Sequence, residues 1–475
     1  MHAKLPNDIQ FSKRILIFSE YVDNNGDLTF GCKLAANIAS QYPNNKIDVC
    51  TIPKKRGKEA CAKGMQLAKD EKLNDFNKNN SYPVKHLDDY IKDNKNKLDM
   101  VIVGPVVMPG CVQDILSLKK KIDFNTKILL ISEYGFPQKS LEQIKELFTD
   151  QGFKNVSIQA TGVTEGKGIF VNQEIKNFNK KDQGQVQTVS QTLGAVGKLL
   201  YGAADEANLS SYLSSHEVAM HYSHNNAEKV VGIHTRYVNS DKDTDLIVLG
   251  ESAKNDKQAL ITNMEILKEK GFAKIVYVDA PNEPETLFDN GRDGSTYRIV
   301  HTGRVSLEQS IALRKISGEF SGATGDQSYS EALSRSPIVI YETQVWKRNF
   351  LEDQIALANQ IDPSGQLGRT IQLMGSQDIK KNEYDELVDL LKQEFVKDGL
   401  QNFRKIATED RCLQDKISEQ IKDMTLVARN KKDEGFSFSK FKKDFMLLIG
   451  KENNGKKELV EDDEEVEDIR KFKMN

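Results

Sequence analysis

The stretch from Phe320 to Ser334 reads FSGATGDQSYSEALS, and it decides how the second half of the chain folds. Its first four residues are typical of a short buried strand, and a helical pattern follows Gly325. A helix that starts directly after a strand offers unpaired backbone N–H groups, here beside the Ser328 hydroxyl, to an anion such as a diphosphate. A second interpretation stays open, because Ser328 and Glu331 also match a capping box that only satisfies the helix's own N–H groups.

Short apolar runs alternate with longer amphipathic or polar stretches along most of the chain. This alternation is typical of β-α-β units, in which helices join buried parallel strands. We therefore expect an α/β fold of two Rossmann-like, mainly parallel sheets with a helical C-terminal appendage. The expected strands lie at 15–18, 47–50, 100–103, 128–131 and 168–171 in the first domain, and at 246–249, 275–278, 297–300, 320–323 and 338–341 in the second.

The chain divides into four expected segments. The first domain is expected at 1–235 and the second at 236–376. A helical region is expected at 377–450, where Tyr384, Leu387 and Leu391 recur at helical spacing. The last segment, 451–475, contains the acidic block EDDEEVED at 461–468, whose like charges repel one another, and we expect it to be disordered.

The composition is that of a globular protein, with 38% hydrophobic and 29% charged residues in 475. The net charge of −3 gives no general attraction to nucleic acid, and we expect none as a partner. The chain has no apolar run of about 18 residues and no apolar signal-peptide core, so we expect neither a membrane span nor general secretion. The five cysteines form no C-x-x-C pair, which favours a reduced cytosol over a disulfide framework.

A second polar loop follows the first expected strand, where residues 23–27 read DNNGD. Phe30, Leu34 and Ile38 are spaced four apart, so a helix should start near Asp27. Its carboxylate is either a favourable charge at the helix N-terminus or a catalytic base at the carboxyl edge of a parallel sheet. The residues by themselves leave both interpretations open.

Taken together, these features resemble the GT-B class of nucleotide-sugar glycosyltransferases. The resemblance lies in the tandem α/β domains, the Asn25-Gly26-Asp27 loop and the Gly-x-x-Ser-x-x-Glu-Ala segment that starts at Gly325. The stretch 23–35 is also similar to the protein-arginine rhamnosyltransferase family. In that family the aspartate matching Asp27 is the proposed base, and an acidic-Asp-Ser triplet binds the donor diphosphate. Asp326-Gln327-Ser328 stands at the matching place, but Gln327 departs from the pattern and leaves the donor open.

The resemblance implies a transferase that uses neither a metal nor a cofactor. It implies a nucleoside-diphosphate sugar as donor in the second domain and a protein or other acceptor beside the first. Asp27 would be the base, with Asn25 and Gly26 beside the substrate. The segment from Gly325 through Asp326 and Gln327 to Ser328 would hold the diphosphate, and Glu331 would bind the nucleotide ribose. The positive charge would come from Arg304 or Lys347.

The acidic tail resembles the export signals of effectors secreted by type IVB systems, as in Legionella-like bacteria. That resemblance implies transfer from the bacterial cytoplasm into a host cytosol. Two other functions stay open: a non-catalytic effector that binds a host protein, and a sugar-nucleotide epimerase. The sequence leaves the oligomeric state open.

Two further patterns resemble metal-binding motifs, but we expect neither to bind a metal. Asp241, Asp243 and Asp245 have D-x-D spacing, which can hold a cation, but we expect them in a solvated linker. His216 and His221 miss the H-E-x-x-H zinc motif by one residue, and on a helix that spacing would place them on different faces. We therefore expect no metal site.

Overall fold

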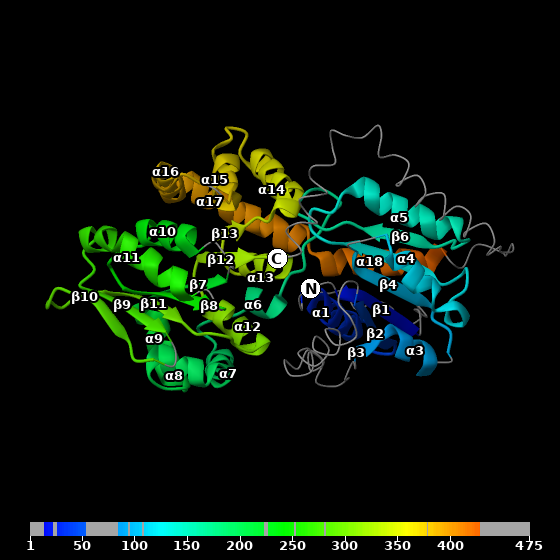
Figure 1. The fold of residues 1–475 in the computed structure, drawn as a ribbon, viewed down its shortest axis with the longest axis horizontal. Helices are drawn as coiled ribbons and strands as arrows, with labels where there is room; N and C mark the ends of the chain where they lie inside the picture. Colours follow the sequence, from blue (N-terminus) through cyan, green and yellow to red (C-terminus); the bar gives the residue numbers. More distant parts are fainter. Residues whose placement is uncertain are drawn as a thin grey trace. The chain divides into compact units, whose positions relative to one another are not determined.

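The computed structural model describes residues 14–21, 26–53, 84–93, 96–106, 109–222, 227–250, 253–279, 282–377 and 379–427. They form two compact units, whose elements are labelled in Figure 1. Unit 1 takes the described residues up to Thr161, together with 345–349 and those from Gln414 on. Unit 2 takes 162–344 and 350–413.

Unit 1 is built on a six-stranded parallel sheet of order β3-β2-β1-β4-β5-β6. The strand order reverses between β1 and β4, and such a reversal creates the crevice at which open α/β sheets bind ligands. The strands are β1 (Arg14–Tyr21), β2 (Lys46–Pro53), β3 (Val84–His86), β4 (Met100–Val106), β5 (Lys127–Ser132) and β6 (Val156–Gln159).

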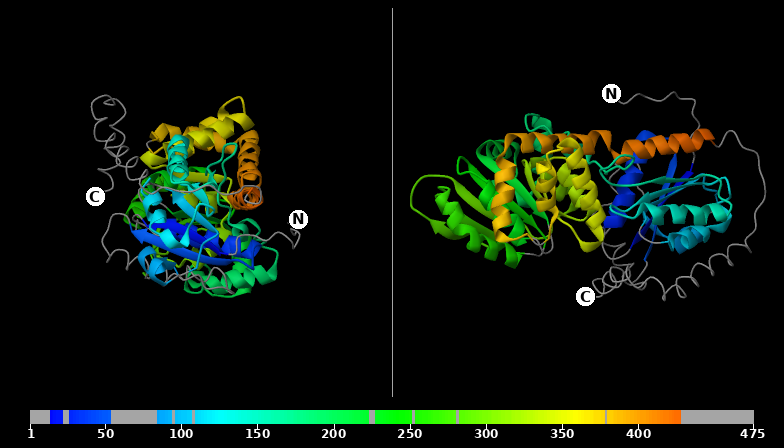
Figure 2. Two further views of the ribbon diagram at one scale, coloured as in Figure 1. Left: turned by 90° about the vertical axis from the view of Figure 1, so that its right-hand side faces the viewer. Right: turned by 90° about the horizontal axis from the view of Figure 1, so that it is seen from above.

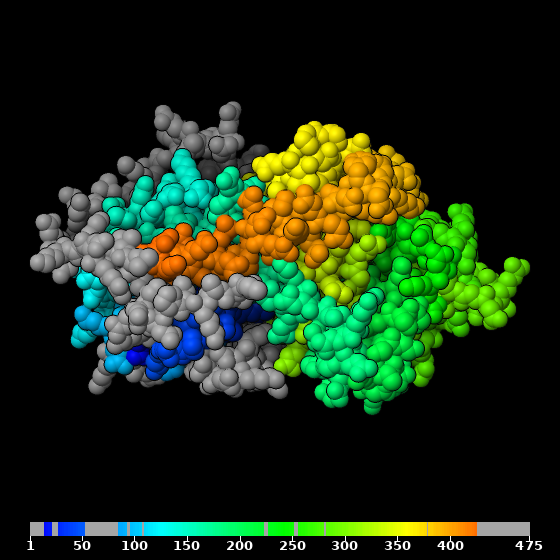
Figure 3. Space-filling model, turned by 180° about the vertical axis from the view of Figure 1, so that it is seen from behind, coloured from blue at the N-terminus to red at the C-terminus, as the bar shows by residue number. Residues whose placement is uncertain are grey.

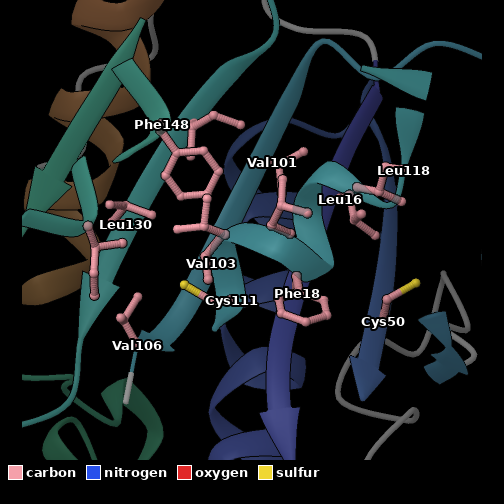
Figure 4. Close-up of a cluster of buried hydrophobic side chains, with 14 of the residues drawn as sticks. Leu16, Phe18, Cys50, Val101, Val103, Val106, Cys111, Leu118, Leu130 and Phe148 are labelled. Carbon is pink, nitrogen blue, oxygen red and sulfur yellow. The ribbon is translucent and has the colours of Figure 1, made fainter. Parts of the chain in front are cut away.

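Both faces of this sheet are covered, because successive side chains of a strand point to opposite sides. Helix α1 (Gly26–Gln41) contacts β1, β2 and β4. Phe18, Val103 and Phe148 belong to one apolar cluster with α3 (Leu87–Asp93), α4 (Cys111–Leu116) and α5 (Gln138–Asp150), part of which Figure 4 shows. The short helix η2 (Lys119–Lys121) precedes β5.

Helix α18 (Leu413–Val427) packs on unit 1, although it lies far from the sheet in sequence (Figure 2). Ser157 of β6 donates a hydrogen bond of 2.5 Å to Gln420, and Ser418 donates one to Gln41 at the end of α1. Its apolar side chains Ile417 and Ile421 are fully buried. The last described helix therefore completes the first unit.

Unit 2 is built on a seven-stranded sheet of order β10-β9-β11-β8-β7-β12-β13, in which only the edge strand β10 is antiparallel. Its order reverses between β7 and β12. The strands are β7 (His216–Tyr222), β8 (Asp243–Leu249), β9 (Lys274–Asp279), β10 (Glu285–Asp289), β11 (Thr296–His301), β12 (Phe320–Thr324) and β13 (Ile338–Glu342).

Helices cover the two faces of this sheet (Figure 1). Helices α7 (Gln183–Leu193), α8 (Ala195–Tyr201), α9 (Glu206–Ser215) and α12 (Leu307–Ile316) share one apolar cluster with β7, β8, β9 and β11. Helices α10 (Ala227–Tyr237) and α11 (Ala253–Glu269) lie on the other face. The remaining described helices of unit 2 are α6 (Gln173–Lys176), α13 (Asp326–Leu333), α14 (Arg348–Ile361), α15 (Gln366–Gly375), α16 (Lys381–Lys392), α17 (Glu394–Lys405) and the π-helix η4 (Ile406–Asp410). The short helix η3 (Val345–Lys347) belongs to unit 1.

The expected fold class, two mainly parallel α/β units, is confirmed, but the boundary between the units differs from the expected one. Residues 162–235 belong to unit 2, because β7 pairs along its whole length with β8 and also with β12. The segment 168–171 is no strand: Gly168 and Ile169 form only isolated bridges, that of Ile169 with Cys412. The expected helical region is helical as far as Val427, and residues 428–475, including the acidic tail, lie outside the described residues.

Among the residues described, none of the helices has the length and apolar character needed to span a bilayer.

Candidate functional site

The parallel strands of unit 2 all end at one edge of the sheet, and polar residues gather there. Ligands of open parallel sheets bind at this carboxyl edge, next to the point where the strand order reverses. The loop from β12 to α13 lies at that point. The polar residues at or directly after the strand ends are Asp279, His301, Thr324, Glu342 and Thr343.

The predicted strand-to-helix turn at Gly325 is confirmed. Gly325 has φ 72° and ψ 162°, and α13 starts at the next residue without a side-chain cap. A Cβ at Gly325 would meet nothing within 4 Å, so glycine is favoured here by its φ and not by crowding. The first N–H groups of α13 therefore have no side chain of the described residues as a cap, as an anion site requires.

The capping-box interpretation of Ser328 and Glu331 is not seen. Ser328 lies inside α13, where its hydroxyl donates to the carbonyls of Thr324 and Gly325. Glu331 accepts a hydrogen bond of 3.1 Å from Gln327 one turn earlier and is buried. The carboxylate of Asp326 in the first turn would repel a diphosphate, so an anion bound here needs a cation nearby.

His301 ends β11 with one ring nitrogen in use and one buried without a partner. Its Nδ1 lies 3.2 Å from Oδ1 of Asp279 at the end of β9. A carboxylate only accepts hydrogen bonds, so Nδ1 carries the hydrogen, and the uncharged form of such a ring has Nε2 as an acceptor. The residue is 5% exposed, and Nε2 has no hydrogen-bond partner among the described residues. A ligand with an N–H or O–H group would satisfy it.

Two threonine hydroxyls farther along the same edge, beyond the ends of β8 and β7, are also buried without a partner in the residues that the structure describes. Thr324 ends β12, and Thr343 directly follows β13, whose last residue Glu342 pairs with Thr324. These threonines are 5% and 7% exposed, and neither Oγ1 has a hydrogen-bond partner within the described part of the chain. A buried polar group without a partner costs about 1–3 kcal/mol, so three such atoms along one edge indicate a place for a polar ligand.

The loop after β11 continues this edge. Gly303 has φ 69°, and a Cβ there would meet nothing within 4 Å. Its carbonyl accepts a bond of 3.3 Å from the backbone N–H of Gly250, which follows β8. Arg304 is exposed in this loop, where the sequence predicts a cation.

The other predicted site residues fall in unit 1. Asp27 is half-buried in the first turn of α1, directly after β1 and at the reversal point of that sheet. Gly26 starts the helix, and Asn25 lies outside the described residues. The grouping of Asp27 with the Gly325 to Glu331 segment stays a prediction.

Lys347 is held within unit 1 by local partners. Its Nζ lies 2.7 Å from Oε1 of Glu133 and donates to the Tyr134 carbonyl at 3.0 Å, and the residue is only 2% exposed. Its charge is therefore already balanced by Glu133. Of the two predicted cations, Arg304 is the one that shares unit 2 with the α13 loop.

The expectation that Asp245 lies in a solvated linker is wrong. Asp245 is fully buried in β8, where Arg298 Nε donates to it at 2.7 Å and the Tyr212 hydroxyl at 2.5 Å. Asp243 starts the same strand. Within the described residues no group of three or more His, Cys, Asp or Glu side chains could hold a metal ion.

The two histidines of the near-zinc motif lie on β7, not on a helix. Burial, with a smaller contribution from Arg314, lowers the pKa of His221 to about 3, so its ring is neutral at physiological pH. A Cβ at Gly322 would come within 2.4 Å of its Nδ1, so this part of β12 requires glycine. His221 is a core residue of the sheet.

Two buried cationic side chains near this edge, Arg314 and Lys229, match no motif in the sequence and were not predicted as site residues. Arg314 of α12 donates to the Ser321 hydroxyl at 2.9 Å and to the Gly322 carbonyl at 3.4 Å, and burial lowers its pKa to about 10. Lys229 of α10 donates to the Met374 carbonyl at 2.8 Å at the end of α15, and burial lowers its pKa to about 7. Only the three-dimensional fold brings these side chains under the sheet edge.

No protein-family model and no curated protein matches the sequence. Solved structures with a similar arrangement include a glycosyltransferase from Rickettsia africae, at 10% identity over 86% of this chain and 98% of that one, with a TM-score of 0.40. HepE from Anabaena in complex with UDP and glucose is 11% identical over 86% of this chain and 100% of its own, with a TM-score of 0.38. α,α-Trehalose 6-phosphate synthase from Burkholderia multivorans is 9% identical over 88% and 100%, with a TM-score of 0.39.

All three TM-scores are below 0.5, so the fold is defined here by the chain's own sheets and helices. Neither comparison supports the resemblance to protein-arginine rhamnosyltransferases, which stays a prediction.

Proposed function

We propose that this chain is a glycosyltransferase that binds a nucleoside-diphosphate sugar at the carboxyl edge of the unit 2 sheet. The observation that carries the proposal is the row of buried atoms without partners, Nε2 of His301 and Oγ1 of Thr324 and Thr343, beside the uncapped N-terminus of α13. A donor nucleotide combines an anionic diphosphate with several N–H and O–H groups. It could therefore satisfy a helix N-terminus and these buried atoms together.

Each residue has a role in the proposed reaction. The first N–H groups of α13 hold the diphosphate and stabilise the charge that develops on it as the sugar leaves, while Arg304 offsets the carboxylate of Asp326. Glu331 binds the ribose through its carboxylate. Asp27 removes a proton from the acceptor, and the reaction needs no metal.

The first experiment is a binding measurement with UDP, GDP and dTDP and their sugars, starting with UDP-glucose because UDP and glucose are bound in the HepE structure. A ligand at 100 times its dissociation constant should raise the free energy of unfolding by about 2.7 kcal/mol. The variant Glu331→Ala should weaken binding of the same nucleotide about tenfold. If no nucleotide raises the melting temperature, the proposed donor site is wrong.

A second experiment separates transfer from binding without turnover. Purified protein that binds a nucleotide sugar should release its sugar slowly to water, and Asp27→Asn should reduce transfer to an acceptor while donor binding persists. A protein acceptor in a host cytosol is the proposed target. Binding without release or transfer would favour a non-catalytic effector, and conversion of the donor into its epimer would favour an epimerase.

A further inference from the structure

A groove of about 740 Å³ lies between α7 and the start of α9 on the helical layer of unit 2. We call it the glutamine groove. It is lined by Gln183, Gln187, Ser190 and Gln191 of α7 and by residues 204–207 and Ser210 around the start of α9. Figure 3 shows the segment that carries it, coloured teal to green, at the surface. The groove belongs to different elements from the sheet edge described above.

Three amides line one side of this groove. Gln183, Gln187 and Gln191 are spaced four apart, so they lie on one face of α7, and all three are exposed. Their side chains make no hydrogen bond to another described residue. Gln185 differs, because its amide is used by Asn179 and Asp182 at the start of the helix. Each free amide offers two hydrogen-bond donors and one acceptor.

Charged residues are few on this helical layer, but two acidic ones, Asp205 and Glu206, line the groove. In residues 183–215 only Lys198, Asp205 and Glu206 are charged, whereas 29% of the whole chain is charged. The Asp205 carboxylate caps α9 by accepting from the backbone N–H of Asn208 at 2.9 Å and from its amide at 2.7 Å. A ligand in the groove would therefore meet amides, serine hydroxyls and two carboxylates, to all of which a hydroxyl group can donate a hydrogen bond.

We propose that the glutamine groove binds a neutral oligosaccharide. Sugar hydroxyls both donate and accept, which matches a row of amides that do the same. Peptide recognition relies on pockets for apolar or charged side chains, and Ala204 and Ala207 are the only described lining residues with apolar side chains. The volume lies within the range of about 300–1,000 Å³ that small-molecule sites occupy. The proposal does not depend on the donor site or on catalysis.

The test is a titration of the full chain with maltotriose, cellotriose and chitotriose, followed by calorimetry and by saturation-transfer NMR of the sugar protons. The double variant Gln187→Ala and Gln191→Ala should weaken binding of the preferred sugar about tenfold. The control is Thr188→Ala, which removes an exposed α7 hydroxyl that bonds to the Gly184 carbonyl outside the groove. It should leave the dissociation constant within about twofold, and both variants should melt like the parent because surface substitutions change stability by only about 0.5 kcal/mol.

Since the ligand is neutral, raising the salt concentration should leave its affinity unchanged. The proposal is overturned if none of the three sugars binds at millimolar concentration, or if binding is unaffected by the glutamine substitutions. It is also overturned if an uncharged Gly-Ser peptide binds and the sugars do not.

Discussion

At the scale of single residues, Gly325 sets the conformation on which the donor site depends. Its φ of 72° is unfavourable for a side chain, although a Cβ would meet no neighbour. We expect Gly325→Ala to lower the free energy of unfolding by about 1–2 kcal/mol and to weaken nucleotide binding as the α13 N–H groups shift. Urea unfolding and nucleotide titration measure the two effects separately.

Gly291 supplies the matched control for that substitution. It has φ 68° and equally open surroundings, but it lies between β10 and β11, away from the α13 loop. Gly291→Ala should cost a similar free energy and leave nucleotide affinity unchanged. Equal loss of affinity in both variants would show that strain anywhere in the unit, and not the loop geometry, controls binding.

Buried histidines make a second residue-scale prediction, which concerns pH. Burial lowers the pKa of His221 and of His234 to about 3, below the value near 6.5 of an unfolded chain. Between these values the unfolded chain binds more protons, so stability should fall as the pH drops from about 6.5 towards 3, by up to about 1.4 kcal/mol per pH unit for each histidine. Above pH 6.5 this contribution should be constant.

Urea unfolding across that range measures the slope. His234→Gln should flatten it, since one of the two buried rings is removed, although the lost bond to the Tyr297 hydroxyl lowers the overall stability. An unchanged slope in His234→Gln would contradict the argument.

At the scale of elements, the residues at the ends of β12 and β13 lower the stability of the free protein but are proposed to bind the ligand. The hydroxyls of Thr324 and Thr343 are buried without partners among the described residues, so each lowers stability unless a ligand binds it. Thr343→Val keeps the shape and removes the hydroxyl. We expect the free protein to become up to about 1 kcal/mol more stable while nucleotide affinity falls about tenfold.

Thermal melts with and without nucleotide test this directly, since the variant should melt higher alone and gain less from the ligand. Thr188→Ala on α7 is the control and should change neither quantity. A variant that is destabilised without ligand would mean that the hydroxyl already has a partner.

At the scale of the whole molecule, local pattern predicted the sheets but not their limits. Apolar runs such as 128–131 and 246–249 are strands because both faces of a parallel sheet are buried. Strand β7 was missed because HEVAMHY has polar ends and no long apolar run, and its place is fixed by pairing with β8 and β12.

Part of the candidate site was likewise predictable from the sequence, and part was not. The turn at Gly325 is local, so the sequence predicted it, whereas His301 and Thr343 became candidates only once strand order placed their ends along the same edge. The same reasoning explains Asp245, whose polarity favoured a loop but whose partners Arg298 and Tyr212 are distant in sequence. A pattern along the sequence does not show which distant residues will pair in the fold.

The return of the chain to unit 1 gives the last prediction. Helix α18 buries Ile417 and Ile421 and bonds to β6 and α1, whereas unit 2 ends at Leu413. A chain that stops after Leu413 should leave unit 2 intact, because the bond from the Leu413 N–H to the Ile169 carbonyl is kept. Unit 1 should lose about 1.5–3 kcal/mol for each apolar side chain removed from its core.

Hydrogen exchange should therefore rise in β5, β6 and α1 and stay unchanged in β7, β8 and β12. A chain that stops after Val427 keeps α18 and is the reference against which this rise is measured. A rise spread equally over both sheets would mean that α18 supports more than the unit it packs on.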